Sequence, residues 1–151
     1  MIKTYWLLLG IFLSFGLQAQ TKPPVQWSFS LTATEQPQQV VLHAMATIED
    51  GWHVFTNQPG GDGLLIPTDI VLNEPNQVTV VNPFSVVGNS ITKNMDGVGN
   101  VNYIEKMGEF TTVLTVKKGQ VVEGVLTYQV CNDRMCLPPT DVPFRLELTN
   151  K

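Results

Sequence analysis

Apolar and polar residues alternate along most of the chain with a period of two, not with the 3.6-residue period of an amphipathic helix. In residues 40–48, for example, Val40 and Leu42 fall on one face and Val41 and His43 on the other. Such alternation is typical of a strand with one buried face, and the β-branched residues that favour strands are frequent throughout. The pattern therefore predicts an all-β protein without a long amphipathic helix.

Nine segments show this strand pattern, and stretches rich in Gly, Pro, Asn and Asp separate them. The predicted strands are residues 27–34, 40–48, 52–56, 68–73, 78–81, 103–104, 110–116, 122–131 and 142–148. The predicted breaks are residues 58–63, 74–77, 94–100, 117–120 and 137–141. About nine short strands at this spacing favour an immunoglobulin-like, two-sheet antiparallel β-sandwich.

The N-terminus has the layout of a signal peptide. Lys3 supplies a positive charge, residues 5–17 form a largely apolar run of 13 residues, and Ala19 places a small residue where cleavage is expected. A helix of that length cannot cross roughly 30 Å of hydrocarbon, so we expect cleavage and no stable membrane span afterwards; an uncleaved anchor is the alternative. The prediction is a signal peptide at 1–19, an extended leader at 20–25 and one β-sandwich domain at 26–151, located in the periplasm or otherwise exported.

Composition excludes several classes of function. The formal net charge is −4 and the mature chain has no cluster of Lys and Arg, which argues against nucleic-acid binding. No Ser-His-Asp or paired-carboxylate arrangement supports hydrolytic chemistry. His43 and His53 lack the spacing of metal ligands, so neither a metal nor a cofactor is expected.

The two cysteines, Cys131 and Cys136, are the informative residues. Export removes them from the reducing thiol pool, and the intervening Asn132-Asp133 favours a turn, so a disulfide between them is expected. Closing a loop of about six residues stabilises a fold by only about 2 kcal/mol, whereas a bridge across most of a domain contributes roughly 4 to 5 kcal/mol. From the residues alone, a redox-active pair and a structural short-loop disulfide both remain open.

Neighbouring residues bear on the reactivity of the pair. Arg134 could stabilise a thiolate, whereas Asp133 would oppose it. Pro138-Pro139 stiffens the chain after Cys136, which suits either role. The local charges therefore do not decide between the two.

Several segments together resemble a known family. They are Tyr128-Gln129-Val130-Cys131, Cys136 with Pro138-Pro139, the final strand at 142–148 and, upstream, Asp50-Gly51-Trp52-His53-Val54-Phe55. The family is the N-terminal periplasmic domain of the thiol:disulfide interchange protein DsbD, and the likeness covers residues 26–148, with only the cysteine block specific. The resemblance implies an immunoglobulin-like module that relays electrons outward across the membrane.

The resemblance also implies roles for individual residues. Cys136 would attack a partner's disulfide and Cys131 would resolve the mixed disulfide. Family members shield the cysteines with a loop that carries an aromatic cap. The aligned stretch at 94–98 has no aromatic residue, so either Met95 takes its place or the shielding is absent. Trp52 and Phe55 could also surround the cysteines, or could belong to the core, as aromatic residues of sandwiches usually do.

Relatives continue into a membrane-spanning electron-transfer domain and a thioredoxin-like domain, whereas this sequence stops at Lys151. The expected partners are therefore a separate membrane electron carrier and exported substrates such as thioredoxin-like oxidoreductases or cytochrome c maturation proteins. The chain would act as a component of a protein-disulfide reductase. The alternative is a non-catalytic immunoglobulin-like binding module in which the bridge only pins a hairpin.

Overall fold

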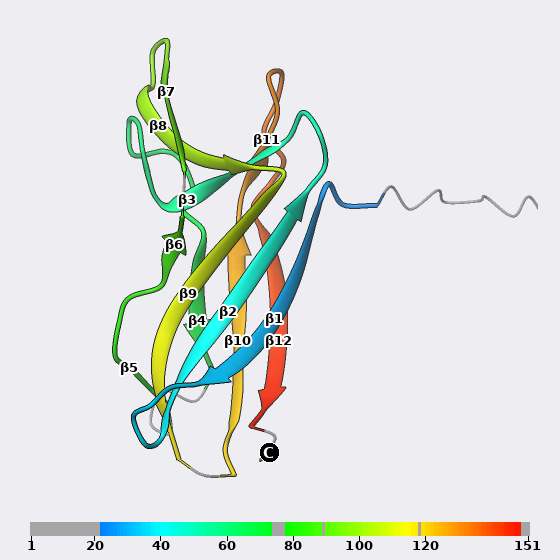
Figure 1. Cartoon of the computed structure of the whole chain (residues 1–151). Helices are drawn as coiled ribbons and strands as arrows, with labels where there is room; N and C mark the ends of the chain where they lie inside the picture. Colours follow the sequence, from blue (N-terminus) through cyan, green and yellow to red (C-terminus); the bar gives the residue numbers. More distant parts are fainter. Residues whose placement is uncertain (1–21, 74–77, 89, 118, 149–151) are drawn as a thin grey trace, which may run out of the picture.

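The computed structural model describes residues 22–73, 78–88, 90–117 and 119–148 (Figure 1). The predicted signal peptide and the predicted break at 74–77 lie outside these residues. Within them the chain forms twelve strands, and no helix that could span a membrane. The strands are β1 Val25–Ala33, β2 Gln39–Ile48, β3 His53–Gly60, β4 Asp69–Leu72, β5 Val78–Val80, β6 Ser85–Val87, β7 Ile91–Met95, β8 Gly99–Glu105, β9 Met107–Val116, β10 Val121–Tyr128, β11 Val130–Cys131 and β12 Thr140–Glu147.

The strands form three antiparallel sheets. The front sheet has the order β1-β2-β9-β5, with β6 also paired to β9, and the back sheet has the order β12-β10-β4. These two sheets form the predicted all-β, immunoglobulin-like sandwich. The third sheet, β11-β3-β8-β7, lies at one end of the sandwich and is called the end sheet here (Figure 1).

Buried side chains join all three sheets. The alternation predicted for residues 40–48 is confirmed, since every second residue of β2 from Val40 to Ala46 is buried. One cluster packs Leu42 of the front sheet with Val122 of the back sheet. A second cluster contains Phe110 of the front sheet, Leu126 of the back sheet and Val54 of the end sheet. The end sheet is thus anchored on the core of the sandwich.

Of the six crossings between the sandwich and the end sheet, three join β2 to β3, β8 to β9 and β10 to β11. The first is the turn from β2 to β3, where Gly51 has φ of 82° and Trp52 N–H donates to the carbonyl of Glu49 over 3.1 Å. The second is Lys106, whose φ of 62° redirects the chain from β8 to β9. The third is Gln129, between β10 and β11. These crossings are why the end sheet is continuous with the sandwich yet oriented differently.

Gln129 also corrects a prediction. Residues 122–131 were expected to be one strand, but β10 ends at Tyr128 in the back sheet and β11 begins at Val130 in the end sheet. The Gln129 side-chain oxygen accepts from the N–H of Ile66, and its NH₂ group donates to the carbonyl of Leu137, both over 3.4 Å. An uninterrupted apolar pattern conceals such a change of partner strand.

The predicted break at 94–100 is also wrong. β7 extends through Met95 and β8 begins at Gly99, so only residues 96–98 form the turn. Polar side chains pair across this hairpin, with Asn94 donating to Asn100 over 2.9 Å. A strand exposed in this way lacks the apolar alternation by which the others were recognised, so β7 was not predicted. The three-residue strand β6 was not predicted either.

Other boundaries differ by smaller amounts. β8 is much longer than the predicted 103–104, β3 continues to Gly60 into the predicted break at 58–63, and β12 begins at Thr140 within the predicted break at 137–141. β1 begins at Val25, within the predicted leader.

Candidate functional site

A disulfide joins Cys131 to Cys136 at the edge of the end sheet. Cys131 ends β11, where it pairs with His53 of β3. The N–H of Leu137 donates to the carbonyl of Val130 over 2.9 Å and closes the loop. The turn expected at Asn132-Asp133 is therefore present, and it brings the two Cα atoms within 4.0 Å.

Asn132 shapes this loop. Its Oδ1 accepts hydrogen bonds from the N–H groups of Arg134 and Met135, each over 2.9 Å. Its own N–H donates to the carbonyl of Met135 over 2.9 Å. Asn suits this position because its side chain can imitate a backbone turn. The loop thus has a set of hydrogen bonds that does not depend on the disulfide.

The two cysteines have different surroundings. Cys131 is 2% exposed and belongs to a buried cluster with Phe55, Val101 and Tyr103, called the Cys131 cluster here. Cys136 is exposed on the loop. A second protein could therefore reach Cys136 directly but not Cys131.

The tip of the β7–β8 hairpin packs against the Cys131 cluster. Met95, at the end of β7, and Val98, in the turn, are partly buried against it, together with Leu65. Gly97 in the turn has φ of 79°, a conformation that glycine adopts without strain. Met95, from the loop in which a cap was expected, therefore packs on the Cys131 cluster.

The remaining predicted site residues lie in three different environments. Phe55 is in the Cys131 cluster, so it is both a core residue and a neighbour of the site. Trp52 packs against the sandwich core and lines a pocket beside the loop. Arg134 is exposed. The structure thus brings Phe55 and Met95 together with Cys131, but not Trp52.

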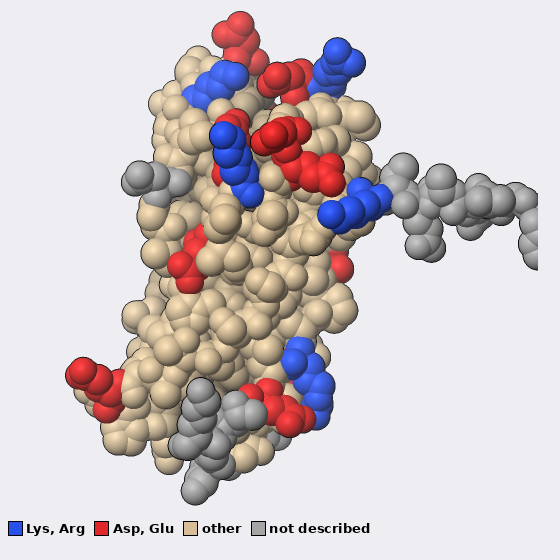
Figure 2. All heavy atoms as spheres, turned by 45° about the vertical axis from the view of Figure 1, so that its right-hand side comes forward, with Lys and Arg blue, Asp and Glu red and all other residues tan. Residues whose placement is uncertain are grey.

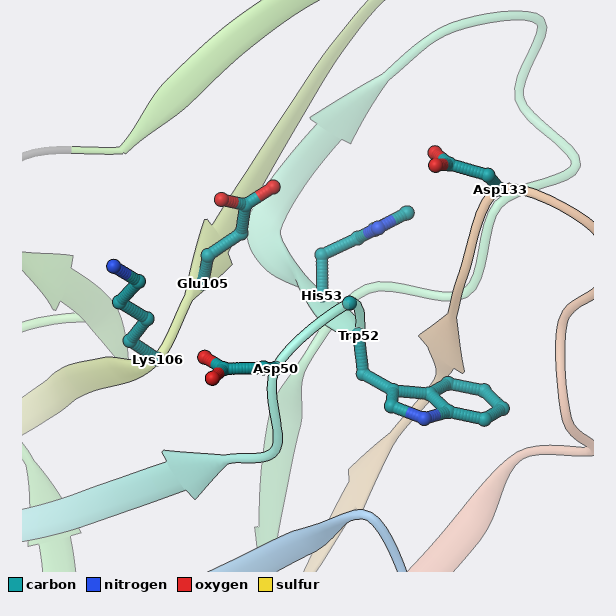
Figure 3. Close-up of a pocket in the computed structure, with 7 residues that line it drawn as sticks. Asp50, Trp52, His53, Glu105, Lys106 and Asp133 are labelled. Carbon is teal, nitrogen blue, oxygen red and sulfur yellow. The ribbon is translucent and has the colours of Figure 1, made fainter.

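Beside the cysteine loop lies a pocket of about 110 Å³ (Figure 3). It is lined by Asp50, Gly51, Trp52, His53, Glu105, Lys106 and Asp133. His53 is 8% exposed, and its ring extends toward Asp133, whereas Trp52 turns away (Figure 3). Burial lowers the pKa of His53; the Glu105 and Asp133 carboxylates oppose this shift, and Lys93 adds to it.

Sequence reasoning considered His53 only as a metal ligand. In the parts of the chain that the structure describes, no three His, Cys, Asp or Glu side chains are arranged to hold a metal. The pairing of β3 with β11 instead places His53 beside Cys131. The alternation within Trp52-His53-Val54-Phe55 indicates that His53 and Phe55 share a face, but it does not indicate which strand pairs beside them.

Charged side chains gather toward the two ends of the face shown in Figure 2, and its middle is largely uncharged. Four charged residues, Asp50, Glu105, Lys106 and Asp133, line the pocket beside the cysteine loop. The lining of the pocket therefore carries three acidic groups and one basic group.

Comparisons with known proteins agree on the fold. The sequence profile of the family described as thiol:disulfide interchange protein DsbD, N-terminal, matches residues 18–148. The N-terminal periplasmic domain of ScsB from Proteus mirabilis superimposes with a TM-score of 0.64 at 20% identity, over 84% of this chain and 47% of that chain. This chain thus spans about half the length of that structure.

Two structures from Neisseria meningitidis are also similar. The reduced form of the DsbD N-terminal domain gives a TM-score of 0.50 at 16% identity, over 82% of this chain and 86% of that chain. A complex between the DsbD and PilB N-terminal domains gives a TM-score of 0.51 at 16% identity, over 87% of this chain and 90% of that chain. At such identities the likeness shows the fold alone. A search of curated protein sequences found no match.

Proposed function

Because this chain belongs to the family of N-terminal domains of the thiol:disulfide interchange protein DsbD, we propose that it exchanges disulfides with other proteins through Cys131 and Cys136. The observation that carries the proposal is the short loop at a sheet edge, in which one cysteine is buried and the other exposed. A bridge of this size contributes little to the stability of a sandwich with its own core. The position of the bridge favours a role in disulfide exchange over a purely structural role.

Cys136 is the attacking thiol and Cys131 the resolving thiol in this proposal. Exchange proceeds through a mixed disulfide, which requires the attacking sulfur to be accessible. Cys136 is exposed and Cys131 is not. After the attack, the hydrogen bonds of Asn132 keep the loop folded, so that Cys131 stays close enough to release the partner.

The proposed partners are thioredoxin-like exported oxidoreductases, including those of cytochrome c maturation, and a separate membrane electron carrier that re-reduces the pair. The Neisseria complex with the PilB N-terminal domain supports the docking of a second protein domain on this fold. Periplasmic or other extracytoplasmic placement follows from the predicted signal peptide, and the ScsB domain is described as periplasmic. Met95 would cover the Cys131 cluster when no partner is bound.

The reduction potential of the Cys131/Cys136 pair tests the proposal. We expect a value above about −300 mV, since structural bridges lie below it. A lower value would mean that the bond is structural and that the chain is a binding module.

Trapping gives a second test. With Cys131→Ser, the exposed Cys136 should accumulate mixed disulfides with exported proteins, because nothing resolves them. Cys136→Ser is the matched control and should accumulate far fewer. Equal adducts with both variants, or none with either, would contradict the assigned roles.

A further inference from the structure

Three side chains form a row across the end sheet. Cys131 of β11 lies opposite His53 of β3, and His53 lies opposite Glu105 of β8. Residues directly opposite in antiparallel strands project from the same face, with Cβ atoms about 4.5–5.5 Å apart. The sheet thus places a thiol, an imidazole and a carboxylate side by side, in that order.

The surroundings of His53 suit a proton acceptor. Its ring lies 4.5 Å from that of Tyr103 and 5.7 Å from that of Phe55, between centroids, so aromatic packing fixes its position. The pocket beside it provides access for water (Figure 3). Since burial lowers the pKa of His53, the ring is neutral at physiological pH and has a free lone pair.

The buried cysteine needs such an acceptor. The thiolate is the nucleophile in disulfide exchange, and an apolar environment disfavours the charged form of a thiol. Cys131 lies in an apolar cluster and must lose a proton to resolve a mixed disulfide. Cys136 is exposed and can lose its proton to water.

We propose that His53 is the general base that accepts the proton of the Cys131 thiol in the resolving step, directly or through one water, an inference that rests on the proposed exchange function. The proton moves from Cys131 Sγ to the imidazole, and the freed electron pair forms the bond to Cys136 Sγ. The bond between Cys136 and the partner breaks, and its electron pair leaves on the partner's sulfur. The Cys131/Cys136 pair is thereby oxidised to a disulfide and the partner is reduced.

Charged groups on three sides tune this step. The imidazolium formed in the resolving step lies opposite the Glu105 carboxylate, and Asp133 approaches it from the cysteine loop. The positive charge of Lys93 on β7 disfavours the protonated ring. Asp50 and Lys106 also line the pocket. The pocket then allows the proton to pass to water.

The two thiols can be followed separately with 5,5′-dithiobis(2-nitrobenzoate). Attack by Cys136 of the reduced protein releases one coloured thiolate, and resolution by Cys131 releases the second. With His53→Gln, the second phase should slow roughly a hundredfold at neutral pH while the first is unchanged, in the lower part of the range for general base catalysis. His43→Gln, which alters the histidine that pairs with Glu109 in the front sheet, should leave both phases unchanged.

Two further variants test the pH dependence without altering a buried residue. In the wild type, the second phase should slow as pH falls through the pKa of His53. Glu105→Gln should move this inflection to lower pH, and Lys93→Gln to higher pH, since the two charges shift the His53 pKa in opposite directions. An inflection that neither substitution moves, or a His53→Gln variant with the wild-type second phase, would overturn the inference.

The outcome is separable from that of the proposed function. The reagent reports the step within the pair, whatever partner the chain has in the cell. A His53-dependent second phase, combined with a potential below about −300 mV and no trapped partner, would uphold the inference and refute the exchange function. Trapped partners with a His53-independent second phase would uphold the exchange function and refute the inference about His53.

Discussion

At the scale of single residues, one side-chain oxygen of Asn132 organises the loop between the cysteines. It accepts hydrogen bonds from the N–H groups of Arg134 and Met135. Asn132→Ala therefore removes two hydrogen bonds that keep the loop in the shape that brings the two sulfurs close. We expect this substitution to disfavour the disulfide by about 1.4 kcal/mol, and so to raise the reduction potential by about 30 mV. Equilibration with glutathione measures the shift. Asn132→Asp retains the acceptor oxygen and should stay near the wild-type value.

His53 also makes stability depend on pH. Burial lowers its pKa in the folded state, so the unfolded chain binds the proton more tightly. The stability contributed by the neutral ring is present above about pH 6.5 and is lost as pH falls from there through the lower, folded pKa. Urea unfolding at pH 7.5 and pH 5 should show a smaller loss in His53→Gln than in the wild type.

At the scale of elements, the tip of the β7–β8 hairpin packs against the site, and we propose that it protects the disulfide. Met95 and Val98 pack on the Cys131 cluster, so Met95→Ala should expose the disulfide and speed its reduction by dithiothreitol several-fold. Met107→Ala is the matched control because Met107 is 66% exposed on β9, outside the cluster. Equal reduction rates in the two variants would mean that Met95 does not act as a cap.

The same hairpin shows where sequence patterns stop being informative. Strands with one buried face, such as β2, could be predicted because burial forces alternation. β7 is exposed over most of its length, and its polar residues pair with those of β8, so no alternation marks it. Gln129 was missed for the opposite reason: the residues on both sides of it are buried, although they belong to different sheets.

At the scale of the whole molecule, the sandwich should not depend on the disulfide. The buried clusters that join the sheets lie on strands that pair with one another without the help of the six-residue cysteine loop. Reduction should therefore cost about 2 kcal/mol of the free energy of unfolding and leave the fold intact. Circular dichroism during urea unfolding, with and without reductant, measures this. Loss of the folded state on reduction would identify the bridge as a structural staple.

The candidate site could be predicted only in part. The cysteine spacing and the turn at Asn132 follow from local sequence, whereas the cap loop was expected only from the family resemblance. The row Cys131–His53–Glu105 does not follow from local sequence, because it depends on which strands pair across the end sheet, and that pairing joins segments far apart in the chain. The unequal burial of the two cysteines likewise depends on Phe55 and Tyr103, which belong to other strands.

The crossings between the sandwich and the end sheet have a consequence for evolution. They separate the reactive loop from the β10–β12 and β2–β9 pairings that hold the sandwich, so mutations can accumulate around the cysteines without loss of the fold. Descendants of one ancestral scaffold could thus acquire different potentials and different partners while keeping the same core. For protein engineers, the end sheet is accordingly the place at which to graft new redox specificity.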